Sequence, residues 1–190
     1  MKDSRGGFGK MKDIGSGIMM EKRAYALLDE EEDRRVWDLF YAMFDFRPSI
    51  KPGTRTFTVQ QPHHIYDISA VEEREIDRMA ELIPAVFAEC LEKEGFLYAL
   101  DWQHSSFRYN PRVKIVESSL WIENPQYQNG GYHAYFPSFY PDGDYYLFLE
   151  KNFKWGYLGH PWQQKVWVFG ERLMEKMENI SKEIGFKRIF

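Results

Sequence analysis

Two segments of this 190-residue chain combine histidine, aspartate and tryptophan at spacings that could support chemistry. The first is ALDWQHSSFRYNP, in which Asp101 and His104 lie three residues apart, with Trp102 between them. Imidazole titrates near neutral pH and carboxylates bind protons or cations, so the pair suits acid–base chemistry or metal binding. On an extended strand the two side chains would point to opposite faces. They therefore converge only if the strand ends or turns between them.

The second segment is YPDGDYYLFLEKNFKWGYLGHPW. Its opening Tyr-Pro-Asp-Gly fits a tight turn and gives Asp142 a structural role, whereas Asp144 has no such role. His160 lies between a glycine and Pro161, and the proline holds the preceding residue extended. We expect His160 to fix this loop by donating a hydrogen bond to a backbone carbonyl.

Familiar catalytic and metal-binding motifs are missing from the chain. His63 and His64 form a third, weaker polar site, and the sequence contains no HExxH, HxH, GxSxG, P-loop, GxGxxG or paired-cysteine motif. The sequence therefore predicts no metal ion and no cofactor. The candidate binding residues all lie in the two segments above: Asp101, Trp102, His104, Asp142, Asp144, Trp155, His160 and Trp162.

Charge and cysteine content limit the partners and the compartment. The net charge is −4, and no basic run provides the patch that nucleic-acid binding needs. A single cysteine, Cys90, rules out an intrachain disulfide, and no apolar run reaches membrane-spanning length. These features favour a cytoplasmic protein that binds neither nucleic acid nor membrane. Cys90 falls on the apolar stripe of a predicted helix, which favours a core position.

The chain divides into a leader and one domain. Residues 1–20 are rich in glycine and lack periodicity, so we expect a flexible leader. Residues 21–190 have the length and composition of a single globular domain.

Capping patterns and apolar periodicity predict the helices. The first begins at Asp29, with Glu32 three residues on, as in a capping box. The second begins at Ser69, with Glu72 at the same spacing, and ends at Gly95. The apolar stripe of the first helix, at helical spacing, is Val36, Phe40, Met43 and Phe44.

Aromatic residues make up 17% of the chain, which favours a core rich in sheet. Strands are predicted at residues 63–68, 96–102, 106–110, 134–140, 144–150, 154–159 and 165–170, and the stretch 113–122 is ambiguous between strand and helix. Short connections make neighbouring strands antiparallel. With a last helix near residues 171–181, the predicted fold is α+β: an antiparallel β-meander with two to three helices packed on one face.

Some of these blocks resemble a known family. YALDWQHSSFRYNP, together with the PDGDYY and GHPW blocks, is similar to the bacterial family known as domain of unknown function 2716. The resemblance covers about residues 27–180 and implies a bacterial, cytoplasmic, single-domain protein, without implying a mechanism.

Two functions remain open. The first is a non-enzymatic binding module that docks onto a protein partner, as immunity proteins do; aromatic and acidic residues interleaved along loops suit such a surface. The second is a small hydrolase, with or without the assistance of a metal, which requires convergence of five side chains: Asp101, His104, Asp142, Asp144 and His160. The missing motifs favour the first. The two functions can be distinguished by whether His104 and His160 lie in one cleft, as the hydrolase requires.

Overall fold

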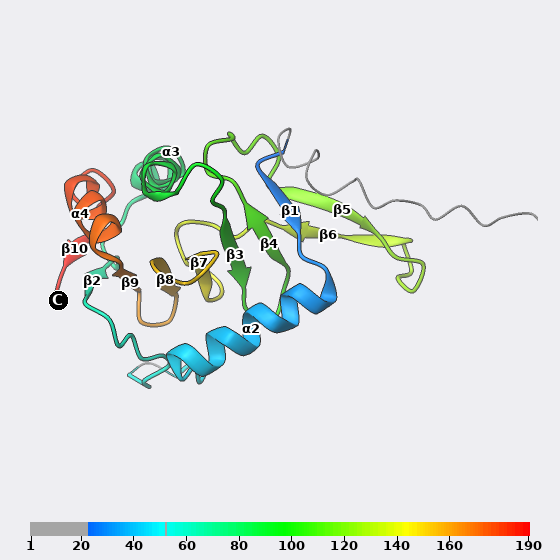
Figure 1. Ribbon diagram of the computed structural model, residues 1–190, viewed down its shortest axis with the longest axis horizontal. Helices are drawn as coiled ribbons and strands as arrows, with labels where there is room; N and C mark the ends of the chain where they lie inside the picture. The colour runs from blue at the N-terminus through cyan, green and yellow to red at the C-terminus, as the bar shows by residue number, and fades with distance from the viewer. Residues whose placement is uncertain (1–22, 52) are drawn as a thin grey trace, which may run out of the picture.

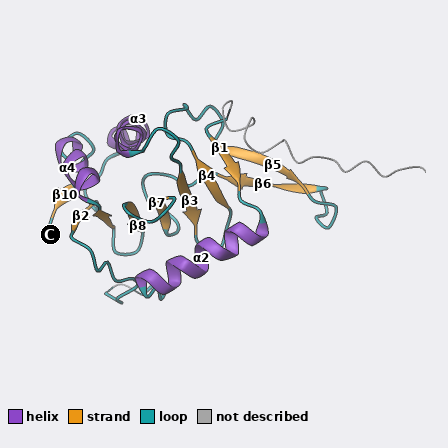
Figure 2. Ribbon diagram, viewed as in Figure 1, coloured by secondary structure: helices purple, strands orange, loops and turns teal. Residues whose placement is uncertain are grey.

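A computed structural model describes residues 23–51 and 53–190 of the chain, so the leader predicted at residues 1–20 lies outside the described residues. The described elements, coloured by type in Figure 2, are β1 (Tyr25–Leu27), α2 (Glu30–Phe44), β2 (His63–Asp67), α3 (Glu73–Cys90), β3 (Leu97–Asp101), β4 (Ser106–Tyr109), β5 (Ser119–Glu123), β6 (Gly131–Tyr135), β7 (Tyr146–Glu150), β8 (Gly156–His160), β9 (Lys165–Phe169), α4 (Glu171–Ile180) and β10 (Lys187–Arg188). None of the described helices is both long and apolar enough to cross a membrane.

An eight-stranded antiparallel sheet forms the body of the protein, with the strand order β1-β4-β3-β7-β8-β9-β2-β10. The run β7-β8-β9 forms part of the predicted meander, whereas the strand predicted before it, at residues 134–140, does not join this sheet. Between β4 and β7 the chain leaves this sheet and forms a separate two-stranded hairpin, β5–β6, which projects from the body (Figure 1). The strand predicted at residues 134–140 is wrong for its last five residues, because β6 ends at Tyr135.

Helices cover both faces of the sheet. One core joins α3 and α4 to sheet residues such as Phe148 and Val166, and a second core joins α2 to residues such as Leu147 and Leu158. Alternate residues of β7 thus enter different cores, as the apolar pattern on both faces of this strand predicts. The predicted α+β class is confirmed, but the single helical layer is a correction: α2 lies on the face opposite to α3 and α4 (Figure 1).

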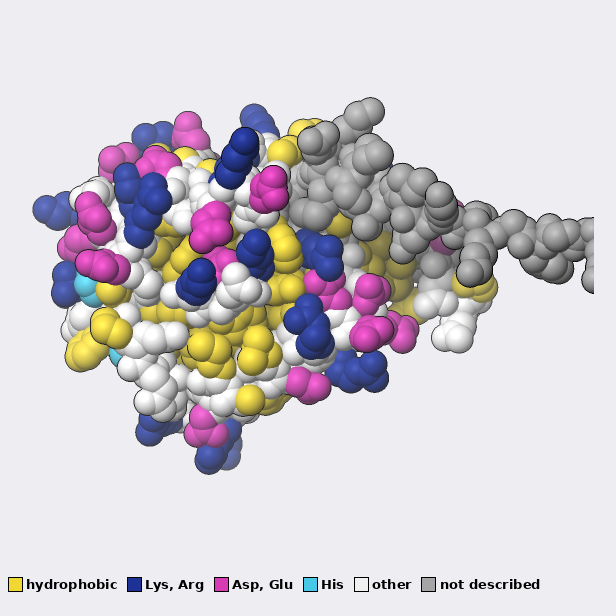
Figure 3. Space-filling model, viewed as in Figure 1, with side chains coloured by type: hydrophobic (Ala, Val, Ile, Leu, Met, Phe, Trp, Pro, Cys, Tyr) yellow, Lys and Arg dark blue, Asp and Glu magenta, His cyan; other side chains and the backbone are white. Residues whose placement is uncertain are grey.

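Apolar side chains are also visible at the surface between these layers. In the space-filling view they gather between α2 and the α3–α4 layer, with charged side chains around them (Figure 3).

Helix α2 begins where its cap predicts, but it buries only part of its predicted apolar stripe. The Asp29 carboxylate accepts a hydrogen bond from the Glu32 amide at 2.8 Å, which satisfies a free donor of the first turn. Asp45 ends the helix in a left-handed conformation, with φ of 45°. Val36 and Phe40 are buried, whereas Met43 is 39% exposed and does not belong to the stripe.

Helix α3 begins three residues later than predicted. The Glu75 carboxylate accepts a hydrogen bond from the Glu72 amide at 2.7 Å. The hydroxyl of Ser69, the predicted cap, instead donates a hydrogen bond to the Asp67 carboxylate. The helix ends at Cys90 rather than Gly95, because Leu91 is already extended. Cys90 is half-buried, and burial raises the pKa of its thiol to about 11, so little nucleophilic thiolate forms at neutral pH.

Candidate functional site

Two aspartates meet at one end of the central strands. Strand β3 ends at Asp101, which lies opposite Tyr146, the first residue of the antiparallel neighbour β7. Asp144 lies two residues before β7 begins. The end of β3 and the entry to β7 are therefore adjacent, although the two aspartates are far apart in the sequence.

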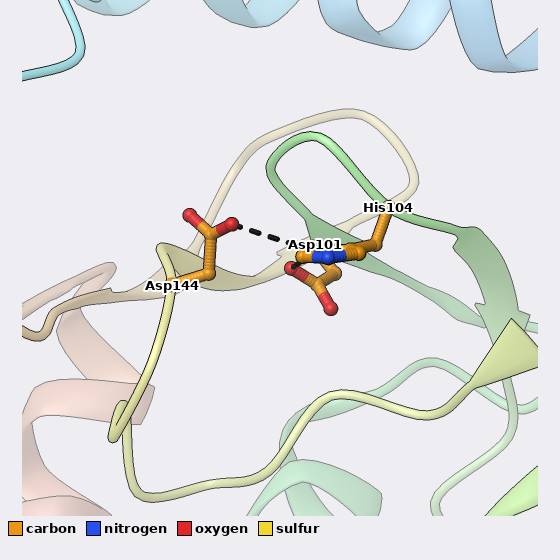
Figure 4. A group of neighbouring side chains, drawn as sticks. All are labelled: Asp101, His104 and Asp144. Carbon is orange, nitrogen blue, oxygen red and sulfur yellow. Dashed lines mark hydrogen bonds and ion pairs between the residues drawn. The ribbon is translucent and has the colours of Figure 1, made fainter.

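A tight turn after β3 brings His104 to these carboxylates. Gln103 adopts a left-handed conformation with φ of 72°, and the His104 amide donates to the Asp101 carbonyl oxygen at 3.1 Å. The strand thus turns at the point where convergence of Asp101 and His104 requires it. The Nδ1 atom of His104 lies 3.1 Å from Oδ1 of Asp101 and 3.4 Å from Oδ2 of Asp144 (Figure 4).

The two carboxylates are buried and the imidazole is not. Asp101 and Asp144 are 6% and 7% exposed, whereas the His104 side chain is 65% exposed. Burial raises the pKa of Asp101 to about 6; the hydrogen bond from His104 opposes that rise, and the charge of Asp144 adds to it.

The pKa values of Asp144 and His104 are also raised. Burial raises the pKa of Asp144, against the hydrogen bond from the Tyr145 amide. Burial on its own lowers the pKa of His104, but the hydrogen bond to Asp101 and the charges of both carboxylates outweigh it, so the net shift is upward. The carboxylates thus favour the charged form of His104, while burial disfavours charge on both aspartates.

An open cleft of about 510 Å³ lies against this cluster, between the β3–β4 turn and the β5–β6 hairpin. Its lining residues are Asp101, Gln103, His104, Ser105, Tyr127, Tyr132, His133, Tyr135 and Tyr146. Sequence reasoning did not single out the four tyrosines or His133, and it assigned no helix or strand to residues 123–133, where three of these residues lie. The alternation of Tyr132 and Ala134 with His133 and Tyr135 was the available signal for a strand there.

His160 lies elsewhere and does not line the cleft. It is fully buried against Tyr145 and Trp167, and its Nδ1 accepts a hydrogen bond from the Gln163 amide at 3.2 Å. This contact holds the loop after β8. The prediction had His160 donate to a backbone carbonyl, whereas in the structure it accepts from a backbone amide. Nε2 is buried with no hydrogen-bond partner among the described residues. Burial, and to a smaller extent Lys165, lowers the pKa of His160 to about 4, so the ring is neutral at pH 7.

The remaining candidates do not join the cluster. Trp102 and Trp162 both pack against Tyr145, in the core on the α2 side of the sheet. Trp155 precedes β8, at its opposite end, and packs against α3. Asp142 is exposed in its turn. Of the eight candidates, the fold brings together Asp101, His104 and Asp144.

Comparisons with known proteins agree with the resemblance of the sequence blocks. A family model described as "Protein of unknown function (DUF2716)" matches residues 27–174, a range that contains the whole cluster and the hairpin. The uncharacterized protein YxiI of Bacillus subtilis (strain 168) is 29% identical over 172 residues, which cover 85% of this chain and 94% of the relative. No solved structure matches the chain.

Proposed function

The chain belongs to the DUF2716 family, and we propose that it is a non-enzymatic binding protein that docks a protein partner on the outer face of the β5–β6 hairpin. The observation that carries the proposal is the aromatic character of this projecting unit. We call Trp121, His133 and Tyr135 the hairpin face. Trp121 is 49% and Tyr135 63% exposed.

Strand pairing explains why the hairpin has two unlike faces. Trp121 lies opposite His133, and their rings are 5.2 Å apart, while Tyr135 lies opposite Ser119. The alternate residues Leu120 and Ala134 point inward and join the core beneath α3. Tyrosine and tryptophan are enriched where proteins bind one another, because they bury much area at a low entropic cost. An aromatic face exposed on a projecting hairpin therefore suits partner recognition.

Grooves on both sides of the hairpin add to this surface. One is the cleft that contains Asp101 and His104. The other, of about 520 Å³, lies between the hairpin and β1 and is lined by residues that include Arg23, Lys114 and Glu117. Because the buried carboxylate of Asp101 lines the cleft and the chain has a net charge of −4, a partner segment with basic side chains would match it best. The proposal places the protein in the cytoplasm, as an immunity-like module.

Affinity capture followed by a purified binding assay tests this proposal. Wild-type protein and the double variant Trp121→Ala/Tyr135→Ala would be used to capture partners from a bacterium that encodes the protein. A protein retained only by wild type would then be purified, and its Kd measured by calorimetry. We expect the double variant to weaken binding by about 30-fold or more, the effect of losing a hot-spot residue.

A matched control uses Leu39 and Met43, which are exposed apolar residues on α2, away from the hairpin. The variant Leu39→Ala/Met43→Ala should bind as wild type does. If this variant loses affinity and the hairpin variant retains it, the docking surface lies on α2 and the proposal is wrong.

A second candidate function is hydrolysis at the cleft, favoured by the Asp101–His104–Asp144 cluster, of which Asp101 and His104 line the cleft. Asp142 and His160, which the sequence suggested for the same chemistry, lie outside it. A panel of ester, amide and phosphoester model substrates tests the idea. Turnover that disappears in His104→Asn, with the circular dichroism spectrum unchanged, would support hydrolysis over docking alone.

A further inference from the structure

We propose that Asp101, His104 and Asp144 form a binding site for one divalent cation of the zinc class, with a coordination position open to the cleft. The inference goes beyond the docking function and does not depend on it. It also departs from the expectation, based on missing motifs, that the protein holds no metal.

The spacing of the donor atoms fits a shared ion. Tetrahedral zinc with bonds of about 2.0–2.2 Å places neighbouring ligand atoms about 3.3–3.6 Å apart. His104 Nδ1 lies 3.1 Å from Asp101 Oδ1 and 3.4 Å from Asp144 Oδ2, and the donor atoms all lie within 4.8 Å of one another. The two printed nitrogen–oxygen spacings thus lie close to the tetrahedral value, and the 4.8 Å bound leaves the carboxylate oxygens to adjust by side-chain rotation.

Hydrogen bonding alone leaves this cluster incompletely satisfied. An imidazole Nδ1 carries at most one hydrogen, so it directs a straight hydrogen bond to one of the two carboxylates and not to both. Asp101 is 94% buried, since 6% of it is exposed, and His104 is its only hydrogen-bond donor among the described side chains and amides. A buried carboxylate with one donor, on the wall of an open cleft, points to a ligand that the cleft admits.

Charge leads to the same conclusion. Two buried carboxyl groups face one imidazole, which can offset at most one negative charge. Buried charge is costly unless it is paired, and among the described residues no lysine or arginine forms an ion pair with either aspartate. A divalent ion would neutralise both carboxylates.

A metal fits this space better than an organic cation does. The Nδ1 atom of His104 already contacts both carboxylates (Figure 4), so an ammonium or guanidinium group would have to displace the ring to bind them. A metal ion instead uses Nδ1 as its third ligand. Two carboxylates and one imidazole form a three-ligand set, and such sets leave the fourth position to water or a ligand. That position would face the cleft tyrosines.

Calorimetric titration of purified, untagged, chelator-treated protein with Zn²⁺ tests the proposal. We expect one ion per chain with a Kd in the micromolar range or tighter. His104→Asn, at an exposed position, should lower the affinity at least 100-fold while the circular dichroism spectrum stays unchanged. Asp144→Asn should do the same and provides an independent check on the carboxylate side.

Matched histidine variants complete the design. His133→Asn removes the other cleft imidazole, and His160→Asn removes the buried one; both should keep wild-type affinity. The proposal is overturned if wild type shows no saturable binding, if His104→Asn binds as wild type does, or if His133→Asn or His160→Asn abolishes binding in folded protein. None of these measurements involves a protein partner, so their failure is distinct from failure of the docking function.

Discussion

Replacing His160 by asparagine should change how stability depends on pH. The wild-type ring is buried and its folded-state pKa is about 4, whereas an unfolded histidine titrates near 6.5. Between these two values the unfolded chain binds a proton that the folded chain does not. Wild-type stability therefore falls as pH decreases through 6.5, and this contribution stops changing below about pH 4.

The size of the effect follows from the two pKa values. A difference of about 2.5 units at 1.36 kcal/mol per unit gives about 3 kcal/mol between pH 7 and pH 4. At pH 7, asparagine can still accept from the Gln163 amide, so His160→Asn should cost only about 1–2 kcal/mol, the range for a disturbed buried hydrogen bond. By pH 4 the wild-type protein should have lost that advantage, and the variant should be as stable or more stable.

Urea unfolding followed by tryptophan fluorescence at pH 4, 5, 6 and 7, with chelator present, provides the measurement. The two proteins share every other titrating group, so the difference between their free energies of unfolding isolates His160. If that difference is constant from pH 7 to pH 4, His160 is not held neutral by burial and the reasoning fails.

Three further substitutions have clear expected outcomes, two in the same unfolding assay and one in amide exchange. Asp101→Asn should stabilise chelator-treated protein at pH 7 by about 1–3 kcal/mol, because it removes a buried charge that has a single donor; a loss of stability would mean that the carboxylate is structural. Gly131→Ala would place a methyl group 2.2 Å from the Ile122 carbonyl oxygen, so we expect the hairpin to distort, with amide exchange in β5 and β6 accelerating while the main sheet stays protected. Glu32→Ala leaves Arg108 without a carboxylate that it contacts at 2.7 Å and should cost about 1–3 kcal/mol; an unchanged urea midpoint would show that solvent replaces the pair.

The parts of the fold that local patterns determine were predictable from the sequence. Residues 145–150 are apolar at nearly every position, which indicates a strand covered on both faces, and β7 is such a strand. Asp29 predicts the start of α2, because its cap is made within one turn. Strand β1, by contrast, has only three residues, too few to show a period, and it is held by pairing with β4.

The candidate site was predictable only in part, because it depends on long-range pairing. The motif search singled out Asp101, His104 and Asp144, but their meeting requires β3 to pair with β7 across the residues of the intervening hairpin. It also requires a left-handed Gln103, a conformation that glutamine does not signal. His160 looked equivalent to His104 in sequence context, and only the sheet register shows that it enters the core on the α2 side instead.

The order in which this sheet assembles should follow from the position of the hairpin in the chain. Strands β7, β8 and β9 are joined by short turns, so their pairing closes small loops, whereas pairing β3 with β7 must enclose residues 102–145. Closing the larger loop costs more chain entropy, which favours a folding nucleus in β7–β9 and later docking of β3. Leu158→Ala should then slow refolding, while Leu97→Ala should mainly accelerate unfolding. If the two variants divide their loss of stability between the folding and unfolding rates in the same proportion, this order of assembly is wrong. The hairpin, lying inside the late-closing loop, is a segment whose residues can change without altering the rate-limiting step.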